Sequence, residues 1–115
     1  TEITGRVKLL FVCSRNQWRS PTAEKIFNKK KGINSKSAGT EPSARIKLNS
    51  QHLEWADIIF VMERKHKERI FQKYGEIVSN KHIEILDIED NFKYMDTELI
   101  EILELSVNPI LERYA

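Results

Sequence analysis

The sequence contains a single cysteine, Cys13, among 115 residues. One cysteine cannot form a disulfide within this chain, and zinc sites built on several cysteines are excluded as well. Scarce cysteine is typical of reducing compartments, so we expect a cytoplasmic protein. The first residues, Thr1–Gly5, lack the basic and then apolar layout of a signal peptide, which agrees with that expectation.

Long apolar runs and a strong excess of one charge are also missing. No run approaches the roughly 18 apolar residues of a membrane span. The 19 Lys and Arg nearly balance the 17 Asp and Glu, leaving a net charge of +2. This is not the clustered basic footprint of a nucleic-acid-binding protein. We therefore expect neither a membrane nor a nucleic acid as partner, and the oligomeric state stays open.

Metal-ligand spacing is absent too, because His52, His66 and His82 are scattered along the chain. We expect no metal and no cofactor. What the sequence does have is ordinary globular composition, with 40% hydrophobic and 31% charged residues. Its length suits one domain over residues 1–115.

Short apolar runs alternate with amphipathic stretches. Val7–Val12 and Asp57–Met62 are apolar enough to predict central parallel strands that are covered on both faces. Two weaker strands are predicted, the first at a sheet edge, over residues 33–38 and 83–86. Helices are predicted over residues 20–31, 48–56 and 63–74 and from residue 96 onward. Ser20 is the expected cap of the first helix, and Gly75 the expected stop of the third, with Ile70 and Phe71 as its core contacts.

This alternation predicts an α/β fold, a doubly wound three-layer sandwich with a four-stranded parallel sheet and helices on both faces. Ligands of such sheets bind beyond the carboxyl ends of the strands. The loops that follow Val12, Met62 and Leu86 are therefore the expected place for a site.

The loop after the first strand carries a pattern with chemical meaning. Cys13 follows the strand directly, Arg19 lies six positions later, and Ser20 comes next, at the start of a helix. A short loop before a helix can point several backbone N–H groups at one tetrahedral anion. A thiol in such a cradle is expected to react as the thiolate, and an Arg side chain can hold two phosphate oxygens in one fork.

The segment from Val12 to Glu24 reads V-C-S-R-N-Q-W-R-S-P-T-A-E and resembles the phosphate-binding signature of the low-molecular-weight protein tyrosine phosphatases, V-C-x-G-N-x-C-R-S-P-x-A-E. The resemblance continues in Ser37–Thr40, like the family's S-A-G-T, and in Ala56–Glu63, like its A-D-x-I-x-x-M-D/E strand. Order and spacing agree over about the first 75 residues.

The resemblance implies roles for named residues. Cys13 would be the nucleophile that forms a phosphocysteine intermediate without a metal, Arg19 would bind phosphate and stabilise the transition state, and Ser20 would support the thiolate. Asn16 would hold the loop in a left-handed conformation. The implied phosphate-binding residues are Ser14, Arg15, Asn16, Gln17, Trp18, Arg19 and Ser20.

The family also uses an Asp followed by Pro as general acid after the last strand, and no Asp-Pro occurs here. Asp90, in Asp-Asn-Phe, is the nearest equivalent; Asp87 is an alternative, and Asp96 is expected to cap the last helix. Phe92 and Tyr94 are each expected either to form a wall against an aromatic substrate or to fill the core.

Other departures are Arg15 in place of the family's Gly and Trp18 in place of its second loop cysteine. The family's H-x-A-R segment reads Ser43-Ala44-Arg45, so Ser43 would have to replace the histidine that supports the loop. The implied substrate is a phosphotyrosine protein or a small aryl phosphate. A degenerate module that binds phosphate without turnover is the alternative. Arsenate reduction is less favoured, because its thioredoxin-coupled form needs further cysteines.

Overall fold

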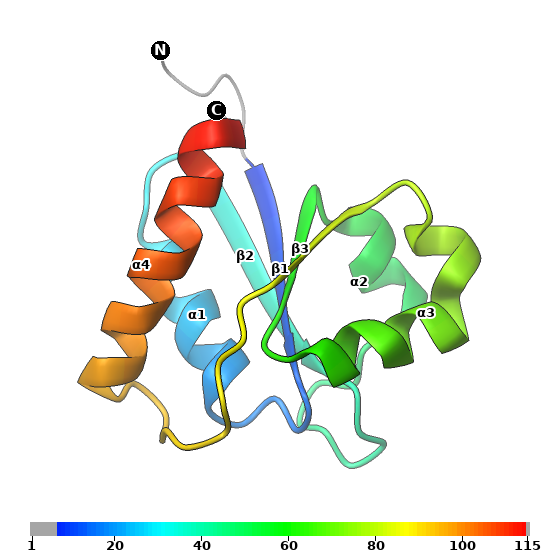
Figure 1. Ribbon diagram of the computed structural model, residues 1–115, viewed down its shortest axis with the longest axis horizontal. Helices are drawn as coiled ribbons and strands as arrows, with labels where there is room; N and C mark the ends of the chain where they lie inside the picture. Colours follow the sequence, from blue (N-terminus) through cyan, green and yellow to red (C-terminus); the bar gives the residue numbers. More distant parts are fainter. Residues whose placement is uncertain (1–6, 115) are drawn as a thin grey trace.

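The computed structural model describes residues 7–114 as a four-stranded parallel sheet between two pairs of helices (Figure 1). The strand order is β2-β1-β3-β4, and all three pairings are parallel. The strands are β1 (Val7–Cys13), β2 (Ile33–Gly39), β3 (Ile58–Val61) and β4 (His82–Ile85). The helices are α1 (Arg19–Asn28), α2 (Ser50–Trp55), α3 (Arg64–Val78) and α4 (Thr97–Tyr114). The predicted doubly wound α/β sandwich is confirmed, with β2 at an edge.

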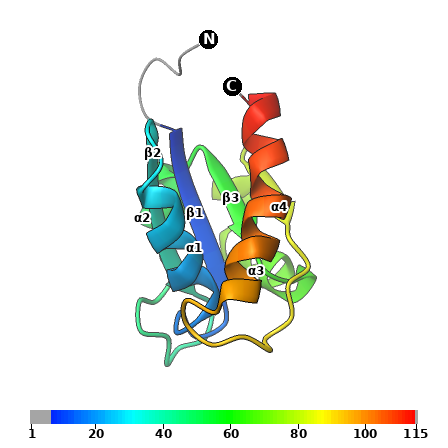
Figure 2. The ribbon, with the colours of Figure 1, turned by 90° about the vertical axis from the view of Figure 1, so that its left-hand side faces the viewer.

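Alternation along β1 divides the core into two layers. Leu9, Phe11 and Cys13 belong to the cluster beneath α1 and α4, whereas Leu10 and Val12 belong to the cluster beneath α2 and α3. Successive side chains of a strand point to opposite faces, and all five are buried because helices cover both faces (Figure 2). The same alternation places Cys13 on the α1 and α4 face, at the carboxyl end of a central strand.

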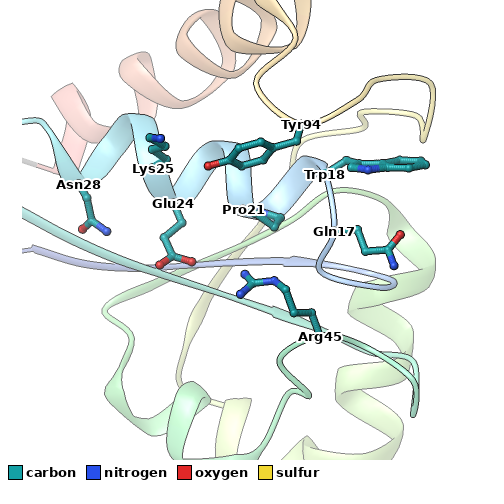
Figure 3. A pocket seen from close by; sticks show the side chains of 8 residues that line it. All are labelled: Gln17, Trp18, Pro21, Glu24, Lys25, Asn28, Arg45 and Tyr94. Carbon is teal, nitrogen blue, oxygen red and sulfur yellow. The ribbon is translucent and has the colours of Figure 1, made fainter.

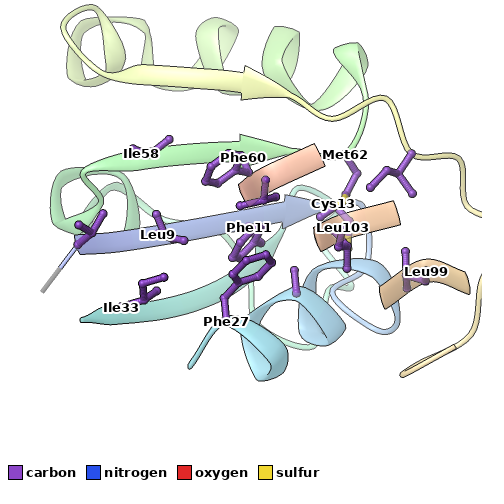
Figure 4. Packing of buried hydrophobic residues seen from close by; sticks show 14 residues of the cluster. Leu9, Phe11, Cys13, Phe27, Ile33, Ile58, Phe60, Met62, Leu99 and Leu103 are labelled. Carbon is purple, nitrogen blue, oxygen red and sulfur yellow. The ribbon is translucent and has the colours of Figure 1, made fainter. Parts of the chain in front are cut away.

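Aromatic packing fixes the centre of that layer (Figure 4). The ring of Phe11 stacks on Phe27 of α1 at 5.5 Å and on Phe60 of β3 at 5.2 Å between centroids. Leu99 and Leu103 of α4 close the layer and are fully buried. Truncating a buried Phe in such a layer typically costs about 3–5 kcal/mol, so this stack anchors the strand that carries Cys13.

Two helix boundaries differ from the predictions. Helix α1 begins at Arg19, and Ser20 does not cap it, because the Ser20 hydroxyl lies 2.9 Å from the Cys13 sulfur instead. Helix α3 breaks at Tyr74 (φ −129°, ψ 29°), directly before the predicted stop Gly75, and a further helical segment follows to Val78. Val78, in the segment beyond the break, belongs to the buried cluster that α2 and α3 cover, so this segment stays packed on the sheet.

The expected core contacts of α3 are half right. Ile70 is buried, whereas Phe71 is 43% exposed and lies against Lys67 on the outer surface. Helix α2 starts at Ser50, two residues later than predicted, with Asn49 as its cap. Within residues 7–114, no helix combines the length and apolar character needed to cross a bilayer.

Candidate active site

The loop between β1 and α1 curls around the sulfur of Cys13. The Asn16 backbone N–H donates to Cys13 Sγ at 3.3 Å, and Ser20 Oγ lies 2.9 Å from the same sulfur. Asn16 Nδ2 donates to Ser20 Oγ at 2.9 Å, which leaves the Ser20 hydroxyl proton free to point at the sulfur. Two donors can therefore converge on the Cys13 sulfur.

The carbonyl groups of the loop are held on its outer side. Glu41 N donates to Ser14 O at 2.9 Å, and Arg45 N donates to Arg15 O at 3.0 Å. The Nε of Arg45 donates to Asn16 O at 3.1 Å. Asn16 itself is fully buried with a φ of 57°, the left-handed conformation expected for it. Carbonyls held outward leave the loop amides to face inward, as an anion cradle requires.

Gly39 allows residues 41–45 to approach the cysteine loop closely. A Cβ at Gly39 would lie 2.5 Å from Ala44 Cβ and 2.6 Å from Ser14 O, closer than real Cβ contacts permit. Any side chain here would push residues 41–45 away from the carbonyl groups they bind. The glycine is therefore required by close packing beneath the loop.

The guanidinium of Arg19 is buried, and hydrogen bonds to residues after β3 and β4 fix its orientation. Its Nη1 donates to Glu63 Oε1 at 2.6 Å and to Ile88 O at 2.8 Å, and its Nε lies 3.6 Å from Asp90 Oδ1. Burial acts to raise the pKa of Glu63, but the hydrogen bond and charge of Arg19 outweigh it, so the pKa lies below its ordinary value. Glu63 is thus a fixed carboxylate that sets the direction of Arg19.

Two adjoining hollows open at this end of the sheet. The smaller, of about 40 Å³, is lined by Cys13, Arg15, Gln17, Trp18, Arg19 and Asp90. The larger is a groove of about 640 Å³ beside α1 (Figure 3), and it shares Gln17 and Trp18 with the smaller one. The groove is also lined by Pro21, Glu24, Lys25, Asn28, Arg45 and Tyr94. A small reactive cavity therefore opens beside a groove wide enough for a larger part of a ligand.

Of the candidate acids, the structure brings only Asp90 to the cavity of Cys13 and Arg19. Asp87 is exposed with a φ of 58° and does not line that cavity. Asp96 Oδ1 accepts from Glu98 N at 2.8 Å, in the first turn of α4, as expected for a cap. The geometry therefore favours Asp90.

Phe92 and Tyr94, each expected either to form a substrate wall or to fill the core, have different surroundings. Phe92 is half-buried and packs against the core cluster beneath α1 and α4, so its expected wall role is not supported. Tyr94 is 46% exposed, lines the groove and lies with its ring toward Lys25. Trp18, 41% exposed, stands at the boundary of both hollows.

A family model described as low molecular weight phosphotyrosine protein phosphatase matches residues 8–49. That stretch contains β1 from its second residue, the cysteine loop, α1 and β2. Over this stretch the chain is similar to that family.

Proteins similar to this chain carry two different substrate names. A protein-arginine-phosphatase from Geobacillus stearothermophilus is 29% identical over 93 residues, and the match covers 60% of this chain and 63% of that protein. The structure of a low molecular weight protein tyrosine phosphatase from T. tengcongensis superposes with a TM-score of 0.76 at 24% identity, covering 93% of this chain and 99% of the other. The tyrosine phosphatase Wzb from Escherichia coli K30, in complex with phosphate, gives 0.75 at 18%, covering 94% and 98%.

His66 is a site residue that the sequence pattern did not single out. Its Nε2 lies 2.9 Å from Ser14 Oγ, and Glu63 N donates to its Nδ1 at 3.0 Å. Ser43, expected to replace the family's supporting histidine, is exposed, whereas the side chains of Arg45 and His66 contact the loop. The available signal was the position of His66 just after β3, at the edge where a ligand was expected.

The other two histidines lie elsewhere. His52 is in the first turn of α2, and His82 at the start of β4 pairs with Glu84. Over the described part of the chain, 7–114, no three His, Cys, Asp or Glu side chains are grouped closely enough to hold a metal ion.

Proposed function

We propose that this chain is a cytoplasmic phosphomonoester hydrolase that acts on phosphotyrosine through a phosphocysteine at Cys13, and that residues 1–115 act as one phosphatase domain. The observation that carries the proposal is the single small cavity shared by Cys13, Arg19 and Asp90. These residues supply a nucleophile, an oxyanion-binding cation and a proton donor at one point, as displacement at phosphorus requires. None of the steps below uses a metal.

In the first step the loop amides of residues 14–19 and the guanidinium of Arg19 hold the phosphoryl oxygens. The Cys13 thiolate attacks phosphorus in line with the leaving oxygen, so an S–P bond forms as the P–O bond to the substrate breaks. Asp90, in its acid form, donates its proton to the leaving phenolate oxygen. The dephosphorylated tyrosine departs and phosphocysteine remains.

In the second step water attacks the phosphorus of phosphocysteine. The Asp90 carboxylate takes a proton from that water, a P–O bond forms and the S–P bond breaks. Inorganic phosphate leaves and the thiolate returns, stabilised by the donors of Ser20 and Asn16 that converge on the sulfur. Asp90 is protonated again at the end, so the cycle closes without an external reactant other than water.

The exposed rings of Trp18 and Tyr94 support an aromatic phosphate as the substrate, either a phosphotyrosine in a protein or a small aryl phosphate. Trp18 borders the reactive cavity, and Tyr94 stands farther along the shared groove. Partly exposed rings of this kind can pack against the phenyl ring of a phosphotyrosine. Because one relative is named an arginine phosphatase, phosphoarginine is the comparison substrate to test.

A module that binds phosphate without turnover is the second candidate. Arg19 already gives its Nη1 to two oxygen atoms, and its Nε lies near Asp90. If these contacts persist when phosphate binds, Arg19 cannot follow the phosphoryl group into the transition state.

The test is hydrolysis of p-nitrophenyl phosphate in EDTA. The wild type should turn over and be inhibited by vanadate, and Cys13→Ser should abolish turnover. Asp90→Asn should lower kcat by roughly a hundredfold for poor leaving groups and less for good ones, whereas Asp87→Asn should match the wild type. Vanadate binding without turnover would establish the binding module, and faster hydrolysis of phosphoarginine than phosphotyrosine peptides would overturn the substrate.

A further inference from the structure

The imidazole of His66 is a fully buried polar group that the steps above do not use. It lies between the first residue of the cysteine loop and the first turn of α3. Nε2 lies 2.9 Å from Ser14 Oγ, and Nδ1 accepts the backbone N–H of Glu63 at 3.0 Å. Both ring nitrogens therefore have partners, and they belong to different segments of the site.

These two bonds define the proton position on the ring. Since Glu63 N–H donates to Nδ1, that nitrogen carries no proton, and the neutral ring has its N–H at Nε2. Nε2 therefore donates to Ser14 Oγ. Burial lowers the pKa of His66 to about 4; the nearby cations Arg19, Lys65 and Arg69 act in the same direction, and Glu63 opposes them. The ring is neutral at pH 7, as this bonding pattern requires.

Through these partners, one side chain is connected to both ends of the loop. Ser14 is the first residue after Cys13, and its own carbonyl is held by Glu41 N. Glu63 uses its carboxylate to hold Nη1 of Arg19, near the other end of the predicted cradle. His66 therefore fixes the start of the loop directly and the Arg19 end through the backbone of Glu63.

We infer that His66 is a positioning residue for the phosphate cradle, with its Nε2–H bond to Ser14 as the contact that acts on the loop. The inference rests on the proposed function. A cradle works only while its amides converge on the phosphoryl oxygens, and a displacement of about 1 Å in a reacting group can cost roughly a hundredfold in rate. Loss of the Ser14 bond removes one of the restraints on that convergence.

Two substitutions separate the loop bond from the bond within α3. His66→Gln places an amide N–H near the position of Nε2 and can still donate to Ser14. His66→Asn places an amide oxygen near Nδ1 and can still accept from Glu63 N, but it does not reach Ser14. We expect His66→Gln to keep kcat within about threefold of wild type, and His66→Asn to lower kcat by roughly ten- to a hundredfold with a smaller change in KM.

Ser14→Ala removes the other partner and keeps the test decisive if a His66 variant folds poorly. It should lower kcat to a similar extent, and adding His66→Asn to it should produce little further loss, because the two residues act through one bond. His52→Asn is the matched control: His52 occupies the same position in the first turn of α2, and its kcat should equal that of the wild type.

Vanadate affinity, measured on the same variants, distinguishes a failure of this inference from a failure of the proposed function. A wild type without turnover would refute the phosphatase proposal, and the order of affinities, wild type and His66→Gln above His66→Asn and Ser14→Ala, would still support the role of His66. Equal kcat and equal vanadate affinity for the Gln and Asn variants would overturn it, as would additive losses in the double variant.

Discussion

The first turns of α2 and α3 share a local design and differ in what their side chains reach. In each, a histidine three residues after the cap accepts the cap's backbone N–H, at 3.2 Å from Asn49 and at 3.0 Å from Glu63. At α2 the Asn49 side chain accepts the His52 N–H and closes the turn on itself. At α3 the Glu63 carboxylate binds Arg19, and the histidine's second nitrogen contacts Ser14.

This difference follows from where each helix begins. Helix α3 starts directly after β3, beside the carboxyl end of β1, where the cysteine loop lies (Figure 1). Helix α2 starts after residues 40–49. Its capping side chains, Asn49 and His52, bond to each other's backbone and not to the cysteine loop. The same short pattern therefore stabilises only a helix in one place and supports the candidate site in the other.

The largest expected effect comes from removing the carboxylate of the α3 turn. Glu63→Ala leaves the Arg19 guanidinium without its shortest partner, so its direction is no longer fixed toward the cavity. We expect kcat/KM for p-nitrophenyl phosphate to fall by roughly a hundredfold or more, in line with the loss of an oriented oxyanion donor. Glu68→Ala, an exposed acid on the same helix, should equal the wild type, and an equal loss in both variants would contradict a specific role of Glu63.

The next effect is the dependence of stability on pH. The folded state holds His66 neutral with a pKa of about 4, below its ordinary value of 6.5. Between these values the unfolded chain binds more protons, so stability falls as pH falls from 6.5 toward 4. The fall assigned to His66 between pH 7 and pH 5 is about 2 kcal/mol.

Urea unfolding of wild type and His66→Gln at pH 7 and pH 5 measures this contribution. The variant should show a shallower pH dependence by about that amount. The pKa of His52 is also lowered, first by burial and then by the Lys36 charge. His52→Gln should flatten the profile less, because His52 is only half-buried. A larger effect at His52 would reverse the expected order.

Much of the fold could be predicted because it depends on local patterns of the sequence. The apolar runs of β1 and β3 identified the central strands, and a cysteine directly after a strand, followed by Arg19 and Ser20, identified the loop. The predicted stop at Gly75 matches the break at Tyr74, whereas the further helical segment that ends in the buried Val78 was not predicted.

The less predictable parts of the site depend on contacts that are distant in sequence. His66 contacts Ser14 across 52 residues, and nothing in the local pattern of α3 distinguishes it from the capping histidine of α2. Asp90 and Asp87 lie three residues apart in an irregular loop, so only the path of that loop separates them. Phe92 and Tyr94, two residues apart in the same loop, are also alike in sequence, yet Phe92 packs against the core and Tyr94 lines the groove.

The smallest expected effect is at the α2 cap. It tests whether the first turn of α2, unlike that of α3, affects stability alone. Asn49→Ala removes the acceptor of the His52 N–H, and loss of such a cap typically costs about 1 kcal/mol. For a chain of this size, Tm should fall by roughly 4–8 °C, as measured by thermal unfolding followed by circular dichroism. kcat and vanadate affinity should not change, because the cap makes no contact with the cysteine loop. A loss of activity without loss of stability would show that the α2 turn also acts on the site, and the distinction between the two turns would fail.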